Sequence, residues 1–303
     1  MTSADRERRW WCDRLHARPD PRGSWRVGPA CRHAGPGPAA TVQDLTVTSF
    51  GTDLTAVLLR PDDATGAVVV VPCYETSTVL GSPAERTRHT GRTAWSQAHG
   101  LHLAGRGLSV LAVPWWFEQH AAADPRTARA TDLTERYSPA AAAHAARLPG
   151  TALGRSVADL VLTLTAALAE GLATAGRVGV FGHSLGGKLA LHLAALDPRV
   201  TAGAAHEPGL GLAHSNWRDP WYLGGQLPGD RDHDDLLALV APRPFLLAGG
   251  GSSDGLHNHD LVARAAAAWT DPADLAVLYH GGGHPLPEHV TAAVAAWLEE
   301  RLS

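Results

Sequence analysis

Six short apolar runs, separated by stretches long enough for helices, constrain the fold of this chain more than any other feature. The runs are 66–72 (GAVVVVP), 109–114 (SVLAVP), 177–184 (RVGVFGHS), 200–207 (VTAGAAHE), 244–250 (PFLLAGG) and 274–282 (DLAVLYHGG). Continuous runs of this kind, rich in branched side chains, are typical of parallel strands covered on both faces. The sequence therefore predicts a mostly parallel sheet.

The stretches between these runs have the periodicity of helices. One apolar stripe precedes the third run and another follows the last: Val157, Leu160, Val161, Leu164, Leu168 and Leu172, and then Val290, Val294, Trp297 and Leu298. Strands that alternate with helices require right-handed crossovers. The expected fold class is therefore α/β, a doubly wound sheet with helices on both faces, and ligands should bind beyond the carboxyl ends of its strands.

The segments outside this alternation divide the chain. Residues 42–50 and 52–60 alternate apolar with polar residues, which predicts a β-hairpin at the edge of the sheet. Residues 1–40 show neither the periodicity of a helix nor that of a strand. They are expected to be either an extended arm, with its tryptophans Trp10, Trp11 and Trp25 packed on the domain, or a disordered tail. Residues 41–303 then form a single domain of the 303-residue chain, with rim insertions near 115–150 and 208–230.

Composition and charge argue against several classes of protein. A net charge of -4, from 26 basic and 30 acidic side chains, gives no broad positive field, so no nucleic-acid partner is expected. The charged N-terminus lacks an apolar signal core, and no later stretch of about 18 apolar residues suggests a membrane partner, so a cytoplasmic location is expected. Three cysteines without CxxC spacing, and histidines without zinc-ligand spacing, predict neither a disulfide framework nor a metal site.

The motif GHSLGG at 182–187 lies between the third apolar run and the helical stretch KLALHLAAL. A GxSxG pattern at a strand-to-helix turn holds its serine in a strained, exposed conformation, and the glycines let the strand and helix approach closely. This context makes Ser184 the candidate nucleophile and predicts the α/β-hydrolase fold. The N–H groups of Leu185, at the first turn of the helix, and of Tyr74, after the first run, are the candidate oxyanion donors.

A serine hydroxyl requires a base within hydrogen-bond reach, and in this fold the chain order is serine, acid, histidine. His284 lies in the Gly/Pro loop that follows the last run, where it is free to lean over the edge of the sheet. It is favoured as the base over His280, which lies at a strand end, and over His289, which falls inside a helix.

Two carboxylates are candidates for the acid that orients this base. Asp254 follows the run 244–250 and occupies the commoner location in this fold, 30 residues before His284. Glu207 ends the run 200–207, beside a proline and a glycine that make its loop rigid. Asp254 is favoured, and the other carboxylate is then expected to cap a loop.

Four segments carry a resemblance to known enzymes: GHSLGGKLALHLAALDPRV, SNWRDPWYLGG, HDDLLALVAPRPFLLAGG and GGGHPLP. From about residue 67 onward the chain resembles bacterial dienelactone-hydrolase-like and acetyl-xylan-esterase-like hydrolases of the α/β-hydrolase superfamily. It is similar, more distantly, to bacterial glucuronoyl esterases, whose lysine four residues after the nucleophile and glutamate acid match Lys188 and Glu207. Leu185 stands where glucuronoyl esterases have an arginine, and Ser184 stands where dienelactone hydrolases have a cysteine.

Further residues are candidates for substrate contacts. Lys188 lies one helical turn beyond Ser184 and is placed either to meet a substrate carboxylate or to be an ordinary surface lysine. Trp217, Trp221 and Tyr222, in the second insertion, are candidates to line a sugar or acyl pocket or only to pack.

The sequence therefore predicts a serine hydrolase that cleaves a carboxylic ester of a small acyl group or a sugar through an acyl-enzyme, without a cofactor. Two alternatives remain open. The first is an acyltransferase or thioesterase of a biosynthetic pathway on the same fold, and the second is a non-catalytic member that binds a small ligand. Because the insertions shape the pocket, the sequence does not identify the substrate. It does not indicate the oligomeric state either.

Overall fold

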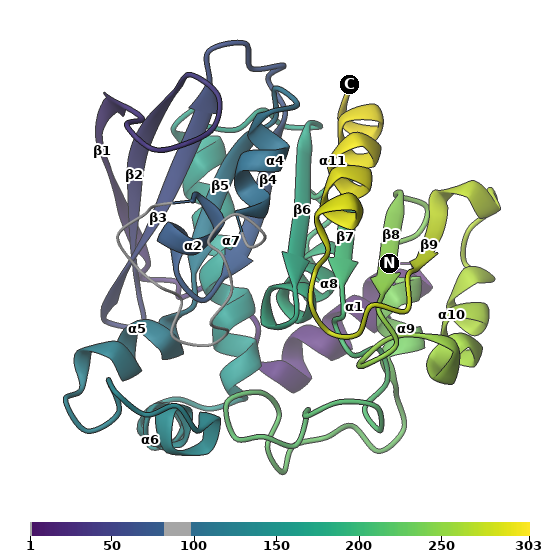
Figure 1. The fold of residues 1–303 in the computed structure, drawn as a ribbon. Coiled ribbons are helices and arrows are strands. Elements are labelled where there is room, and N and C mark those ends of the chain that lie inside the picture. Colours follow the sequence, from purple (N-terminus) through teal and green to yellow (C-terminus); the bar gives the residue numbers. More distant parts are fainter. Residues whose placement is uncertain (1, 82–97) are drawn as a thin grey trace.

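The computed structural model describes residues 2–81 and 98–303, which form a nine-stranded sheet between helices (Figure 1). The strands are β1 (Ser24–Arg32), β2 (Ala40–Ser49), β3 (Thr52–Pro61), β4 (Val68–Cys73), β5 (Ser109–Pro114), β6 (Val178–His183), β7 (Ala202–His206), β8 (Phe245–Gly249) and β9 (Leu275–Tyr279). Their order in the sheet is β1-β2-β3-β5-β4-β6-β7-β8-β9. Every neighbouring pair from β5 to β9 is parallel, which confirms the six strands predicted from the apolar runs.

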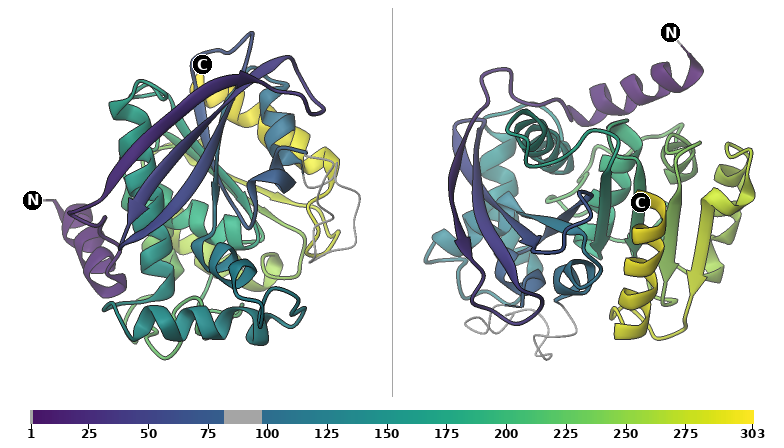
Figure 2. Two further views of the ribbon diagram at one scale, coloured as in Figure 1. Left: turned by 90° about the vertical axis from the view of Figure 1, so that its left-hand side faces the viewer. Right: turned by 90° about the horizontal axis from the view of Figure 1, so that it is seen from above.

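Helices cover both faces of this sheet (Figure 2). They are α1 (Ser3–Leu15), α2 (Thr76–Val79), α4 (His99–Ala104), α5 (Trp116–Ala123), α6 (Leu133–Ala145), α7 (Ala152–Ala169), α8 (Leu185–Leu196), α9 (His233–Ala238), α10 (His259–Ala266) and α11 (Glu288–Leu302), with 3₁₀ turns at Leu256–Asn258 and Pro272–Asp274. Helices α1, α7, α8 and α9 share one apolar core, whereas α4 and α11 share the other. The doubly wound α/β architecture is thus confirmed.

Helix α7 is the longest helix in the described part of the chain and is largely apolar. By length and composition it could cross a membrane, but 78% of its residues are buried inside the protein. The predicted stripe of leucines and valines lies against strand β2 and helix α8, so α7 is a core helix of this domain.

The hairpin is formed as predicted, but it does not lie at the edge of the sheet. Strands β2 and β3 pair antiparallel up to Ser49 and Thr52, next to the turn. Strand β1 then pairs with the free side of β2 and becomes the edge strand. The prediction that the hairpin lies at the edge was wrong because the sequence of β1 does not alternate apolar with polar residues along its length. This strand is largely exposed, and its register with β2 shifts between Val27 and Ala30.

The expectation that residues 1–40 lack regular structure is also wrong, since they contain α1 and β1. Helix α1 begins at a capping box between Thr2 and Asp5, and only its Trp11 and Leu15 are fully buried. So narrow an apolar stripe, in a segment full of arginines, gives little periodicity. The tryptophans do pack on the domain: Trp11 is buried in the core, and Trp10 and Trp25 lie against it.

Both insertions lie beyond the carboxyl ends of the parallel strands (Figure 1). The first forms α5 and α6, which are joined by a buried ion pair between Glu118 and Arg136. The hydroxyl of Tyr137 donates to the same Glu118 carboxylate at 2.6 Å. The second, 208–230, contains no helix or strand. Both segments are therefore placed over the carboxyl ends of the strands, where ligands bind in sheets of this kind.

Candidate active site

Ser184 occupies the tight turn between β6 and α8 that the sequence predicts. Its φ of 57° lies in the left-handed region, which costs energy for a residue with a side chain. Its N–H donates to the carbonyl of His206 at 2.9 Å, which ties the turn to the neighbouring strand. A Cβ on Gly182 would overlap the backbone of Gly186, and one on Gly186 would overlap the carbonyl of Pro72, so both positions require glycine.

His284 lies beside this serine. Its Nε2 is 2.8 Å from Ser184 Oγ, and its Nδ1 is 3.3 Å from Glu207 Oε2. The side chain of His284 remains 45% exposed, whereas that of Glu207 is fully buried. The structure therefore brings together a serine, a histidine and a carboxylate in the order that nucleophilic catalysis requires.

Glu207 is held in its ionised form by the loop that follows β8. The N–H groups of Gly250 and Ser253 each donate to its carboxylate at 2.5 Å. Burial by itself would raise the pKa of Glu207, but the hydrogen bonds from His284, Ser253 and Gly250 lower it to about 2. Like Ser184, Glu207 has a positive φ, 52°, so the backbone is strained at two of the three positions.

The preference for Asp254 as the acid was wrong. Its carboxylate accepts hydrogen bonds from the N–H groups of Gly209 and Leu210, at 2.5 and 2.8 Å, and from Nδ2 of Asn258 at 2.8 Å. Asp254 is buried, and burial raises its pKa despite these bonds. The loop after β8 turns its side chain under the second insertion, so Asp254 anchors that insertion instead of facing the imidazole.

Three neighbouring histidines, His183, His206 and His280, form a hydrogen-bonded row beside the serine, histidine and carboxylate of the site, and the sequence did not predict this group. His183 Nδ1 is 2.8 Å from His206 Nδ1, and His206 Nε2 is 2.9 Å from His280 Nε2. The His183 ring is also 5.1 Å from that of His284. His280, a rival for the base, thus supports the site from below, and His289 lies in α11 as predicted. In the sequence, the only sign of this row is that a histidine directly precedes both Ser184 and Glu207.

The proton positions along this row follow from one backbone contact. The N–H of Gly282 donates to His280 Nδ1 at 3.1 Å, so a neutral His280 carries its proton on Nε2 and donates to His206. His206 then donates from Nδ1 to His183. Burial lowers the pKa of His206 to about 3 and also lowers the pKa of His183 and His280, so the row is neutral near pH 7. It links the loop that carries His284 to strands β7 and β6.

A cavity of about 420 Å³ opens over Ser184 and His284. Lys188 and Tyr222 line it, as does Tyr74 from the loop after β4. Tyr74 shares a hydrogen bond with Tyr222, and burial raises the pKa of Tyr74 to about 12. Leu133 of the first insertion also lines it, so the cavity is built from the strand ends and both insertions.

Lys188 is a buried lysine of this cavity. Its Nζ donates to the carbonyl of Pro208 at 3.0 Å and to Oγ of Ser215 at 2.8 Å, and it lies 3.9 Å from the centre of the Trp217 ring. Burial lowers the pKa of Lys188 to about 7. It is thus not an ordinary surface lysine.

The two candidate tryptophans pack behind the cavity wall. Trp217 is fully buried, and its Nε1 donates to the carbonyl of Gly209 at 2.7 Å. Trp221 is buried against Tyr137 of the first insertion. Neither belongs to the described residues that line the cavity, so their contribution is to support Lys188 and Tyr222. Among the described residues, no group of three or more His, Cys, Asp or Glu side chains is arranged to hold a metal ion.

Comparison with known proteins gives matches of structure but none of sequence. The sequence matches no protein-family model and no curated protein. The structure is similar to a promiscuous CE15 esterase from a marine bacterial metagenome, with a TM-score of 0.68 and 13% identity over 97% of this chain and 91% of that one. It is also similar to a glucuronoyl esterase from Solibacter usitatus, with a TM-score of 0.65 and 19% identity over 98% and 92% of the two chains.

A candidate acetyl xylan esterase from Bacteroides fragilis has a TM-score of 0.63 and 17% identity over 91% of this chain and 74% of its own. At these identities the likeness shows the fold, which is the predicted α/β-hydrolase fold. The predicted resemblance to glucuronoyl and acetyl xylan esterases is confirmed at the same level.

The ionised state of Glu207 gives a prediction for stability. Because its pKa of about 2 lies below the ordinary value of 4.5, ionisation stabilises the fold above pH 4.5, and this stabilisation is lost as the pH falls towards 2. We expect Glu207→Gln to lower the free energy of unfolding by about 3 kcal/mol at pH 7 and by progressively less below pH 4.5. Denaturant titrations at several pH values measure this, with the exposed Glu300→Gln as control. A difference from wild type that stays constant with pH would contradict it.

Proposed function

We propose that this protein is a serine-dependent carboxylic ester hydrolase, with Ser184 as nucleophile and His284 as general base. The observation that carries the proposal is the 2.8 Å contact between Ser184 Oγ and His284 Nε2, with Glu207 on the other ring nitrogen. A base in this position takes the hydroxyl proton as the oxygen attacks the ester carbonyl. Glu207, ionised by its hydrogen bonds, stabilises the imidazolium that forms.

The remaining steps use groups at the same strand ends. The N–H of Leu185, at the positive end of helix α8, and that of Tyr74, in the loop after β4, are proposed to hold the tetrahedral oxyanion. The imidazolium of His284 then gives its proton to the departing alcohol, which leaves an acyl group on Ser184. Water, deprotonated by the same imidazole, releases the acid. No cofactor takes part in these steps.

The exposure of His284 favours hydrolysis over acyl transfer. An acyltransferase must keep water from its acyl-enzyme, but the imidazole that would activate the acceptor is 45% exposed here. The assembled triad likewise favours an enzyme over a member of the fold that only binds a ligand.

The polar wall of the cavity favours a sugar ester as substrate. Polar side chains line the cavity over Ser184, among them Lys188, Ser215, Asn216 and Tyr222. Near pH 7 Lys188 is partly protonated, and its ammonium form has one N–H beyond the two that donate to Pro208 and Ser215. Hydroxyl groups of a sugar or uronate match such a wall, and the structural neighbours include glucuronoyl esterases. We therefore propose an ester of a sugar or sugar acid, presented as a small molecule.

Replacement of the nucleophile tests this function. We expect Ser184→Ala to lower kcat for p-nitrophenyl acetate by at least about a thousandfold, because the attacking oxygen is lost. The same loss is expected with sugar acetates and methyl uronates, assayed by acid release. Ser24→Ala, at an exposed serine of edge strand β1, is the matched control and should retain activity. Equal turnover by wild type and Ser184→Ala would contradict the proposal.

The histidine row gives a second kinetic prediction. His280→Ala removes the donor to His206 and frees the loop that carries His284, so we expect kcat to fall by about tenfold or more with little change in KM. His280→Gln should recover most of this loss, since its amide N–H₂ can donate to His206 Nε2. If Gln rescues nothing, or if the loss appears in KM alone, the row does not position the base.

A further inference from the structure

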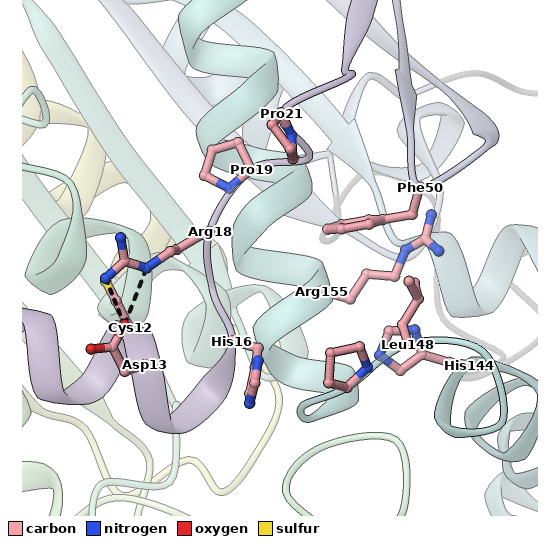
Figure 3. Close-up of a pocket in the computed structure, with 11 residues that line it drawn as sticks. Cys12, Asp13, His16, Arg18, Pro19, Pro21, Phe50, His144, Leu148 and Arg155 are labelled. Carbon is pink, nitrogen blue, oxygen red and sulfur yellow. Dashed lines mark hydrogen bonds and ion pairs between the residues drawn. The ribbon is translucent and has the colours of Figure 1, made fainter.

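A second cavity, of about 320 Å³, lies apart from the active site and shares no lining residue with it (Figure 3). One side is formed by the end of α1 and the linker to β1, including His16, Pro19 and Pro21. The other is formed by the β2–β3 turn and by the segment from the end of α6 to the start of α7. Its volume suits a ligand of modest size, because small-molecule sites begin near 300 Å³.

Arg155 provides a fixed cation in this cavity. Its guanidinium lies over two aromatic rings, 4.0 Å from the centre of Trp116 and 5.3 Å from that of Phe50. Its Nε donates to Asp159, and its Nη2 donates to Ser49 and Thr52. Among the described residues, Nη1 has no hydrogen-bond partner. The guanidinium is therefore held rigidly with two N–H groups available to a ligand.

His144 is a buried polar side chain without satisfied hydrogen bonds. It is only 5% exposed and lines the same cavity. The nearby backbone of Thr151 acts to raise its pKa, but at a geometry too poor for a hydrogen bond, so neither ring nitrogen has a partner of normal geometry among the described residues. Burial, reinforced by Arg155, lowers the pKa of His144 to about 4, so the ring is neutral near pH 7 and carries one N–H. Orphaned buried polar atoms are rare and call for a partner. A ligand acceptor would supply one.

Phe50 is an unusual residue for its place in the backbone. Phe50 and Gly51 form the two-residue β2–β3 turn, with φ of 50° and 76°. Turns with two positive φ values favour Asn-Gly, because a bulky side chain is strained there. Figure 3 shows the Phe50 ring beside Arg155, at the wall of the cavity. Its side chain thus gives the cavity an apolar wall, although a phenylalanine strains the backbone at this position of the turn.

We propose that this cavity binds a small carboxylate carried on an apolar ring. The carboxylate would accept hydrogen bonds from Arg155 Nη1 and from the N–H of His144. Its ring would lie against Phe50 and the neighbouring prolines, Pro19, Pro21 and Pro149. A rigidly held cation beside apolar walls favours an anion with a hydrophobic body over a sugar or a cation. The carboxylate of Asp13, which also lines the cavity, is paired with Arg18.

The test is isothermal titration calorimetry of the full-length protein with benzoate and phenylacetate, with benzyl alcohol as the uncharged analogue. We expect saturable binding of at least one carboxylate, and at least tenfold weaker binding of the alcohol. Phe50→Asn, which keeps the turn, and His144→Phe, which keeps the packing, should each weaken binding of the carboxylate at least tenfold. Lys188→Met, in the active-site cavity, should leave it unchanged.

Thermal unfolding separates binding from folding. Phe50→Asn relieves the strained turn, so its melting temperature should equal or exceed that of wild type. His144→Phe provides an independent variant if Phe50→Asn loses stability. Absence of saturable binding, binding that survives both variants, or binding lost only in Lys188→Met would overturn the proposal, the last by assigning the ligand to the active site.

Discussion

The register of two parallel strands determines where the chemistry can occur. His183 of β6 pairs with His206 of β7, so the next residue of each strand, Ser184 and Glu207, emerges side by side at the carboxyl edge of the sheet. The N–H of Ser184 donates to His206, which locks the two strand ends together. Such closeness requires glycine at 182, 186 and 187, because a Cβ at any of them would overlap neighbouring backbone atoms. The imidazole of His284 lies where its two ring nitrogens reach Ser184 Oγ and Glu207 Oε2.

Buried polar groups fix the irregular segments around this edge. The Glu207 carboxylate orders the loop after β8, and Asp254, in that same loop, holds the second insertion through Gly209 and Leu210. The ion pair of Glu118 with Arg136 joins the helices of the first insertion. Each carboxylate is satisfied by several donors, as burial of charge requires. The histidine row connects the loop that carries His284 to strands β6 and β7, so the loops on both sides of the site are tied to the sheet by hydrogen bonds.

Much of this architecture is predictable from the sequence because its signals are local. Continuous apolar runs predicted the parallel strands, and GHSLGG at a strand end predicted the turn at Ser184. The choice between Glu207 and Asp254 failed because it depends on how the loop after β8 folds back, which no periodicity records. Strand β1 and helix α1 were missed since their apolar stripes are narrow. The contacts between Phe50, Arg155 and His144 join segments far apart in the chain, beyond the reach of local patterns.

The central claim is that Ser184 is activated by His284 and that Glu207, not Asp254, orients this base. Labelling with a fluorophosphonate probe, followed by peptide mass spectrometry, reports the reactivity of the serine directly and without knowledge of the substrate. The account predicts modification at Ser184 that is at least about a hundredfold slower in His284→Gln, clearly slower in Glu207→Gln, and close to the wild-type rate in folded Asp254→Asn. Labelling of another serine, or equal rates in wild type and His284→Gln, would contradict it.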